Sequence, residues 1–439
     1  MKTLIKNGLI VNEGNSFIGS ILIENELISE IFCGNDTLPE ADVVIDATSK
    51  VVFPGVIDDQ VHFREPGASH KATIESESKA AILGGVTSFM DMPNNNPPAT
   101  SICDIEKKFT IAQSDSYANY SFYLGATNSN LEEILSVDPS KVCGVKIFMG
   151  SSTGNMLVDN EDTLNSIFSK SKILLATHCE DEQTIKSNLD SALEKYGENI
   201  PFSEHPKIRS EEACVKSTKK AIALAEKYNS TLHILHISTA TEAKLLAEAR
   251  RVNSSITGEI CTHYLWFDNR DYNEYGAKIK CNPAIKGEKD KLALRDALKK
   301  GDIQVVATDH APHLITEKNN NYLNSPSGIP MVQNSLQLML ELVKLGVFTL
   351  EEVATFMSHN PATIFSIDRR GFIRKGYYAD LAIVDIERPS INIPAYKCGW
   401  SPFKSFSSTI DTTILNGEVV VRNSELIGVK AAKRLIFNR

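Results

Sequence analysis

The sequence predicts an α/β protein: a (β/α)8 TIM-type barrel with a small β-sheet domain built from the N- and C-terminal segments. Two observations support this prediction. Apolar runs of strand length alternate with helical patterns through the middle of the chain, and both ends read as short β segments. Parallel strands need crossover connections, which the intervening helical patterns supply. A doubly wound open sheet would show the same alternation and is the competing fold.

The two ends of the chain resemble each other in pattern. Residues 3–53 contain LIKNGLIV, SILIEN, LISEIF and VVIDA, and residues 371–421 contain GFIR, ADLAIVDI and TTILNGEVVV. Turn residues separate these runs, as expected for β structure. We therefore divide the chain into a barrel over 54–365 and one small β domain formed jointly by 1–53 and 366–439.

Eight apolar runs are the candidate barrel strands: Val52–Ile57, Val86–Met90, Tyr120–Leu124, Val142–Phe148, Ile173–Ala176, Leu232–Leu235, Ser255–Cys261 and Ile303–Ala307. Helical patterns lie between most of them, including Ser78–Leu83, Glu211–Tyr228, Thr241–Ala249 and Lys289–Lys299. The polar segment Lys318–Asn324 has the composition of a mobile loop.

The composition excludes several classes of function. A net charge of −9 without a basic run argues against a nucleic-acid partner. The chain shows neither a signal peptide nor an apolar run of membrane-spanning length, so we expect a cytoplasmic protein without a membrane partner. Eight scattered cysteines form neither a disulfide framework nor a zinc ribbon, and most are expected to be buried apolar residues.

Polar side chains follow the predicted strands where metal ligands would be useful. They include Asp58, Asp59, Gln60, His62 and Arg64 after the first strand, Lys146 in the fourth, His178 after the fifth, His236 after the sixth, and Asp309, His310 and His313 after the eighth. The C-terminal strand ends of a barrel meet at one mouth, where catalytic groups collect. These residues are therefore expected to be neighbours in space.

The residue types at this mouth suit a divalent cation. Imidazoles and carboxylates bind zinc and similar ions, and a bound ion can lower the pKa of water to about 7. Lys146 lies in an apolar strand, where desolvation favours the neutral amine. Reaction with carbon dioxide would convert that amine into an anionic carbamate that can bridge two metals. A structural ion pair is the alternative role for Lys146.

The remaining histidines are expected to be structural. His233 lies three residues before His236, so a regular strand would point it to the opposite face, into packing. By the same alternation Asp59 should face away from the mouth. His310 is expected to orient its surroundings, and His70, His205 and His359 stand in polar loop or helix-end contexts.

At these residues the chain resembles the dihydroorotases of the amidohydrolase superfamily, over nearly its whole length. The resemblance rests on six segments in order: Pro54-Gly55, His62–Gly67 (HFREPG), Gly84–Thr87 with Met92–Asn94, Lys280–Pro283 (KCNP), Thr308–His313 (TDHAPH), and Gly376 with Ala379-Asp380. The terminal β segments also resemble the composite sheet domain of cyclic amidohydrolases.

The resemblance implies a role for each matching residue. Lys146 would be the carbamylated bridge, His178 and His236 would complete one metal site, and His62 and Asp309 would belong to the other. Asp309 would also carry the proton. Arg64 and Asn94 would hold a substrate carboxylate, while Asn282, His313 and the backbone at Ser327 and Gly328 would contact the ring amide. One or two Zn²⁺ ions, or another divalent metal, would be the cofactor.

The implied reaction is the reversible cyclisation of N-carbamoyl-L-aspartate to L-dihydroorotate in pyrimidine biosynthesis, by a metal-activated hydroxide. The partner would be this small molecule, and a homodimer is the default assembly. Gln60 departs from the family, which normally has histidine there, so the metal site of His62 and Asp309 is in question. Two alternatives remain: a hydantoinase or allantoinase, which usually lack Arg at position 64, and a metal-poor scaffold without activity.

Overall fold

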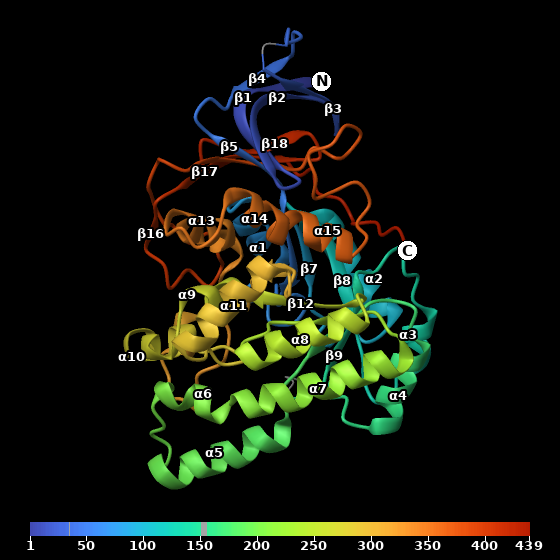
Figure 1. The fold of residues 1–439 in the computed structure, drawn as a ribbon, viewed down its shortest axis with the longest axis vertical. Helices are drawn as coiled ribbons and strands as arrows, with labels where there is room; N and C mark the ends of the chain where they lie inside the picture. Colours follow the sequence, from blue (N-terminus) through green and yellow to red (C-terminus); the bar gives the residue numbers. More distant parts are fainter. Residues whose placement is uncertain (35, 151–155) are drawn as a thin grey trace.

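The computed structural model describes residues 1–34, 36–150 and 156–439, and its central feature is a barrel of eight parallel strands (Figure 1). The strands pair in chain order, and a parallel bridge between Val61 and His310 joins the last to the first. Their bounds are β6 Val56–Val61, β7 Val86–Asp91, β8 Asn119–Gly125, β9 Gly144–Phe148, β10 Leu175–His178, β11 Leu232–Ile234, β12 Ile256–Cys261 and β13 Val305–Ala307. The predicted barrel is confirmed, and the open sheet is excluded.

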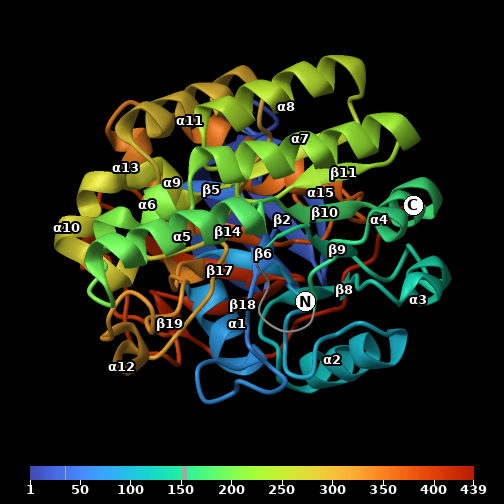
Figure 2. The same cartoon turned by 90° about the horizontal axis from the view of Figure 1, so that it is seen from below.

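Helices surround these strands, with α7 and α8 on one side and α1 and α2 on the opposite side (Figure 2). Helix α7 shows why they form: Ser210 caps its first turn, Glu211 and Glu212 lie near the positive end of the dipole, and left-handed Asn229 ends it. The α-helices are α1 Ile74–Leu83, α2 Ile102–Asp115, α3 Leu131–Ser136, α4 Glu161–Lys170, α5 Glu182–Tyr196, α6 His205–Ile208, α7 Glu211–Tyr228, α8 Ala240–Val252, α9 Thr262–Trp266, α10 Tyr272–Tyr275, α11 Glu288–Lys300, α12 Ile315–Lys318, α13 Ser335–Lys344, α14 Leu350–Ala354 and α15 Asn360–Ile364.

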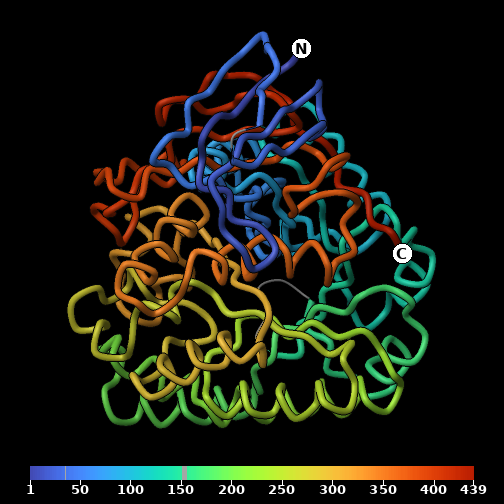
Figure 3. Tube along the Cα trace, turned by 45° about the horizontal axis from the view of Figure 1, so that its top comes forward, coloured from blue at the N-terminus to red at the C-terminus, as the bar shows by residue number. Residues whose placement is uncertain are grey.

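The two ends of the chain lie side by side in a separate sheet (Figure 3). Its strands run in the order β19-β18-β17-β14-β5-β1-β2-β3, with β4 beside β1. Their bounds are β1 Lys2–Asn12, β2 Asn15–Glu24, β3 Leu27–Cys33, β4 Val43–Asp46, β5 Val51–Pro54, β14 Leu381–Asp385, β17 Thr409–Leu415, β18 Glu418–Arg422 and β19 Glu425–Leu426. A short pair, β15 Ser390–Ile391 with β16 Ser405–Phe406, stands apart from it. The composite sheet predicted from the termini is therefore present.

The first predicted strand, Val52–Ile57, is two strands. Its first half belongs to β5 in the terminal sheet and its second half to β6 in the barrel, and the chain changes sheet at Gly55. A Cβ on Gly55 would lie 2.2 Å from the Thr87 hydroxyl, so only glycine fits this turn. No polar residue interrupts the apolar run, which is why the sequence reads as one strand.

The C-terminal tail closes the end of the barrel opposite the mouth. Leu435 and Phe437 pack inside with Phe365 in one buried apolar cluster. The Arg439 guanidinium donates to the carbonyls of Cys143 and Phe365, beside the start of β9. Among the described residues, the tail therefore covers the end of the barrel that lies away from the mouth.

The segment Lys318–Asn324 is anchored, although its composition predicts a mobile loop. Lys318 is fully buried and donates to the carbonyls of Lys280, Pro326 and Gly328. Tyr322 is buried against His205. Within the described residues, no helix is both long and apolar enough to cross a membrane.

Candidate active site

A cavity of about 220 Å³ opens at the C-terminal ends of the barrel strands. It brings together every residue to which the family resemblance gave a role, whereas Asp58, Asp59 and His310 do not line it. Its lining contains His62, Lys146, His178, His236, Asp309, Arg64, Asn94, Asn282, His313, Ser327 and Gly328, together with Gln60, Phe148, Ala311 and Pro326. Scattered strand-end residues thus converge on one place. We call Gln60, His62, Lys146, His178, His236 and Asp309 the mouth group.

Three of the lining residues have left-handed backbone conformations. The φ angles are 66° at Arg64, 40° at His236 and 47° at Asp309. Such a conformation strains a residue with a side chain and persists where the surrounding structure enforces it, often at functional sites. It also breaks strand alternation, because β11 ends at Ile234 and His236 turns inward beyond it.

His178 and His236 present ring nitrogens to each other, with Nδ1 of His178 2.8 Å from Nε2 of His236. The other ring nitrogen of His178, Nε2, lies 3.1 Å from the carboxylate of Glu180, which in turn pairs with Arg209. Burial lowers the pKa of both imidazoles, most strongly at His236. The two rings are therefore neutral near pH 7, and at least one facing nitrogen carries a lone pair.

His62, beside Asp309, also has one ring nitrogen held by a neighbouring side chain and the other facing the site. Its Nδ1 lies 2.7 Å from Oδ1 of Asn94, an acceptor, so Nδ1 donates and Nε2 is left to face Oδ1 of Asp309 at 3.0 Å. The Gln60 amide donates to the same Asp309 oxygen at 3.1 Å. Burial alone would raise the pKa of Asp309, but the hydrogen bond and charge of His62 hold that pKa below its ordinary value. Asp309 is thus a carboxylate at neutral pH.

Lys146 lies on β9 at the floor of the cavity. Its side chain is 1% exposed, and no carboxylate of the described residues lies within 4.0 Å of Nζ. Burial lowers the pKa of Lys146 to about 8. The described part of the chain therefore contains no ion pair of Lys146, which was the alternative structural role for this residue. A substantial fraction of the amine is neutral near physiological pH.

These donors fit a divalent cation. Nδ1 of His178 faces Nε2 of His236, and Nε2 of His62 faces the Asp309 carboxylate, so three ring nitrogens and a carboxylate oxygen are grouped where a cation could bind them. The second ring nitrogen of each ligand histidine usually has an anchoring partner, as Glu180 and Asn94 supply here. The Gln60 carbonyl oxygen is buried without a hydrogen-bond partner among the described residues and could serve as a further ligand.

The opposite wall of the cavity is cationic. The Arg64 guanidinium lies 3.1 Å from Nε2 of His313 and donates to the carbonyl of Pro312. Lys71 donates to Nδ1 of His313 at 3.1 Å, so this ring carries its proton on Nε2, which lies 3.1 Å from the carbonyl of Ser327. Burial lowers the pKa of His313 far below its ordinary value, so the ring is neutral and Arg64 supplies the positive charge of this wall, which favours an anionic ligand group.

Two lining groups are placed to meet an amide. The Asn282 carbonyl oxygen is buried without a hydrogen-bond partner among the described residues. Gly328 has φ 146°, and a Cβ there would lie 2.3 Å from the Ala311 carbonyl, so the backbone at Ser327 and Gly328 comes close to the cavity because residue 328 is glycine.

Several other histidines have the structural contacts expected of them. His310 pairs with Glu77 and accepts from the backbone of Met331. His205 bridges Tyr322 and the Cys281 carbonyl, and His359 contacts the Gly371 carbonyl. Six of the eight cysteines are buried, and all are free thiols.

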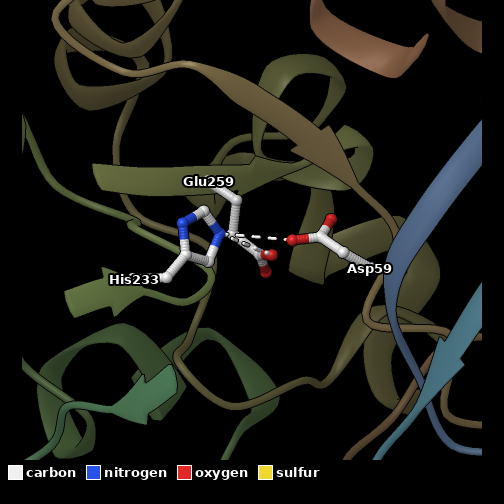
Figure 4. A group of neighbouring side chains, drawn as sticks. All are labelled: Asp59, His233 and Glu259. Atoms are coloured by element: carbon white, nitrogen blue, oxygen red, sulfur yellow. Dashed lines mark hydrogen bonds and ion pairs between the residues drawn. The ribbon is translucent and has the colours of Figure 1, made fainter. Parts of the chain in front are cut away.

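His233 differs from expectation. It does not pack among apolar side chains alone but forms a fully buried group with Asp59 and Glu259 (Figure 4). We call these three residues the deep cluster. The alternation argument failed because the left-handed residue at His236 lets both histidines lie inside the barrel, one layer apart. Asp59 does not line the cavity, in agreement with its predicted orientation.

The sequence analysis missed two residues near the site. His263 lies two residues beyond β12, is fully buried, and neither of its ring nitrogens has a hydrogen-bond partner within the described residues. Burial lowers its pKa to about 4. Its position after a predicted strand was an available signal. Lys71 follows the HFREPG segment in a loop and carried no such signal.

Comparison with known proteins agrees with this geometry. Residues 51–420 match the model of the Amidohydrolase family. A dihydroorotase from Methanosphaera stadtmanae is 32% identical over 93% of this chain and 94% of its own length. A dihydroorotase from Enterococcus faecalis is 33% identical over 88% of this chain and 90% of its own.

Solved structures show the same fold. The L-hydantoinase from Arthrobacter aurescens has a TM-score of 0.94 at 23% identity, covering 99% of both chains. A dihydropyrimidinase from Brevibacillus agri has a TM-score of 0.91 at 25% identity, covering 100% of both. The barrel, its mouth group and these matches together place the chain in the amidohydrolase family, among relatives named dihydroorotase.

Proposed function

We propose that the protein is a dihydroorotase, which interconverts N-carbamoyl-L-aspartate and L-dihydroorotate in pyrimidine biosynthesis. The observation that carries this proposal is the Arg64 guanidinium in the lining of the cavity that the mouth group also borders. A cavity of about 220 Å³ suits a single small ring, and the guanidinium would bind a ring carboxylate.

We propose that His178, His236 and Lys146, the last as its carbamate, hold one Zn²⁺-type ion, and that His62, Asp309 and the Gln60 oxygen border a second. When bound, a divalent cation supplies a Lewis acid that polarises the ring carbonyl and makes water acidic at neutral pH. The protein's own groups perform the remaining steps.

Asp309 is the proposed proton carrier. Its depressed pKa keeps it ionised, so it can take a proton from the attacking water and deliver it to the departing ring nitrogen. Arg64 and Asn94 orient the substrate through its carboxylate, and Asn282 with the backbone at Ser327 and Gly328 meets the ring amide. Binding at one end of the ring thus places its carbonyl over the mouth group.

The test is an assay of purified protein with zinc, cobalt or manganese and bicarbonate supplied. Ring opening of dihydroorotate and the reverse cyclisation are expected, and failure of both defeats the proposal. Arg64→Ala should raise KM for dihydroorotate by about 100-fold, the value of a lost charge-assisted pair. Lys79→Ala, at a half-buried lysine that pairs with Glu75 and Tyr117 and does not line the cavity, is the control.

Hydantoinase activity is the second candidate, because the solved structures cited above carry that title or the related dihydropyrimidinase one. Hydantoin has no carboxylate for Arg64 to bind. Preferential turnover of hydantoin, unaffected by Arg64→Ala, would establish that reading and exclude the first.

We further propose a cytoplasmic homodimer without a nucleic-acid partner, organised as the barrel 54–365 and a joint domain of 1–53 and 366–439. Sedimentation equilibrium of the purified chain tests the dimer, and limited proteolysis tests the division.

A further inference from the structure

We propose that the deep cluster, Asp59, His233 and Glu259, is a buried structural site for a zinc-type divalent cation, separate from the mouth group. The three side chains come from β6, β11 and β12 and point toward one another inside the barrel (Figure 4). The deep cluster lies further inside the barrel than the mouth group, because each of its residues comes before the C-terminal end of its strand. This inference goes beyond the proposed function and does not depend on it.

The hydrogen bonds of His233 leave one ring nitrogen for the cluster. The Thr257 hydroxyl donates to the Leu232 carbonyl, so it accepts from Nδ1 of His233 at 2.7 Å. In the neutral ring, Nε2 then carries a lone pair that faces both carboxylates. Such an anchored second nitrogen is the usual arrangement of a metal-ligating histidine.

The distances favour coordination over hydrogen bonds. Nε2 of His233 lies 3.2 Å from Oδ2 of Asp59 and 3.4 Å from Oε2 of Glu259. A charge-assisted N–H···O⁻ bond would be about 2.7–2.9 Å long. Two ligand atoms that are each about 2.0–2.1 Å from a tetrahedral zinc are about 3.3–3.4 Å apart. The observed separations correspond to the edges of such a tetrahedron.

Unsatisfied charge supplies an independent argument. All three side chains are fully buried, and neither carboxylate oxygen of Asp59 has a hydrogen-bond donor within the described residues. Two buried carboxylates against a single imidazole would be costly without a further proton or a cation among them. One oxygen of each carboxylate and one ring nitrogen make three donor atoms, all within 4.8 Å of one another.

The deep cluster also contacts the mouth group. The second oxygen of Glu259 accepts from the backbone N–H of His236 at 3.1 Å. A cation that fixes Glu259 would thereby fix the left-handed turn at His236. The ligand set of imidazole and carboxylates, without thiolate, suits zinc or manganese.

Anomalous diffraction from crystals grown with zinc tests the site directly. We expect a zinc peak enclosed by Asp59, His233 and Glu259, in addition to any at His178 and His236. Density at the mouth with none in the deep cluster would overturn the proposal, whether or not the protein opens dihydroorotate.

Metal analysis of purified protein tests it in solution. Asp59→Asn should lower the zinc content by one equivalent per chain, whereas Asp58→Asn should leave it unchanged, because the Asp58 carboxylate is satisfied by the Thr308 hydroxyl. Lys146→Ala should retain the deep equivalent. Equal zinc in the wild type and Asp59→Asn would overturn the proposal, and if Asp59→Asn does not fold, the wild-type anomalous map decides alone.

Discussion

The mouth group and the deep cluster are built from the same residue types but differ in what can reach them. In both, a histidine has one ring nitrogen anchored by a neutral or acidic neighbour while the other faces electron-rich atoms. The mouth borders a cavity, whereas the deep cluster is enclosed by the barrel wall and the C-terminal tail. Under our two proposals, similar donor groups would serve turnover at the mouth and only stability in the deep cluster.

Ionisation separates the two regions as well. Asp309 at the mouth has a pKa below its ordinary value, while burial and the charge of Asp59 raise the pKa of Glu259 well above its own. A carboxylate that must exchange protons during a reaction needs partners that favour its charged form. An enclosed carboxylate lacks such partners and needs either a proton or a cation for itself.

The largest expected effect comes from Lys146→Ala. Removing the proposed bridging ligand should lower kcat/KM for dihydroorotate by more than about 100-fold, because loss even of an outer partner of a ligand costs 10–100-fold. Asp59→Asn in the deep cluster should reduce activity far less. Steady-state assays of the two variants make the comparison, and comparable losses would show that the two regions are one functional unit.

Chelation should distinguish the regions kinetically. EDTA should abolish activity through the open mouth while leaving one equivalent of zinc in the enclosed cluster, since that ion has no path to solvent through the described structure. Metal content and activity are measured on the same dialysed sample. Simultaneous loss of all metal and activity would mean that the deep cluster is as accessible as the mouth.

Lys71→Met extends the comparison to His313, whose tautomer Lys71 fixes. Without the Lys71 donor, His313 is no longer held with its proton on Nε2, and its bond to the Ser327 carbonyl in the cavity wall, worth about 1–1.5 kcal/mol, is weakened. KM for dihydroorotate should rise by about 10-fold with kcat nearly unchanged. Lys71→Arg should restore most of the loss, and an effect on kcat alone would contradict this role.

Gln60→His should increase the affinity of the mouth group for metal, an effect that we expect to be smaller than those of the preceding variants. Imidazole is a better ligand than an amide oxygen for zinc-type ions, so the variant should hold metal more tightly against a competing chelator. The zinc content of the deep cluster should not change. If the variant retained metal less tightly than the wild type, Gln60 would be the better ligand in this site, and its presence would not reflect a loss of metal binding.

The sequence was sufficient for the architecture, but not for the contacts within the site. Strand-end positions predicted that His62, Lys146, His178, His236 and Asp309 would border one cavity, because parallel strands of a barrel end at a common mouth, whereas Asn94, Asn282, Ser327 and Gly328 were predicted from the family resemblance alone. Alternation failed at His233, since a single left-handed residue at His236 reverses it, and backbone φ is not readable from an ordinary residue type. Lys71 reaches the site from a loop, where no periodicity guides prediction.

A last comparison concerns two buried lysines, Lys146 at the mouth and Lys318 beneath the loop that it anchors. Lys318 donates to three carbonyls, yet burial lowers its pKa to about 7. Between pH 7 and its ordinary value of 10.5 the unfolded chain therefore binds a proton that the folded chain lacks. The free energy of unfolding should thus rise with pH above 7, by up to about 1.4 kcal/mol per unit.

Lys318→Met removes this proton and should flatten the dependence. Urea unfolding at pH 7, 8 and 9 is expected to show the wild type gaining about 2 kcal/mol over the variant across this range. Lys300→Met, at an exposed lysine paired with Asp296, should follow the wild type. Parallel curves for all three proteins would mean that Lys318 stays charged in the fold, and that three carbonyl acceptors suffice to hold an enclosed cation without a carboxylate.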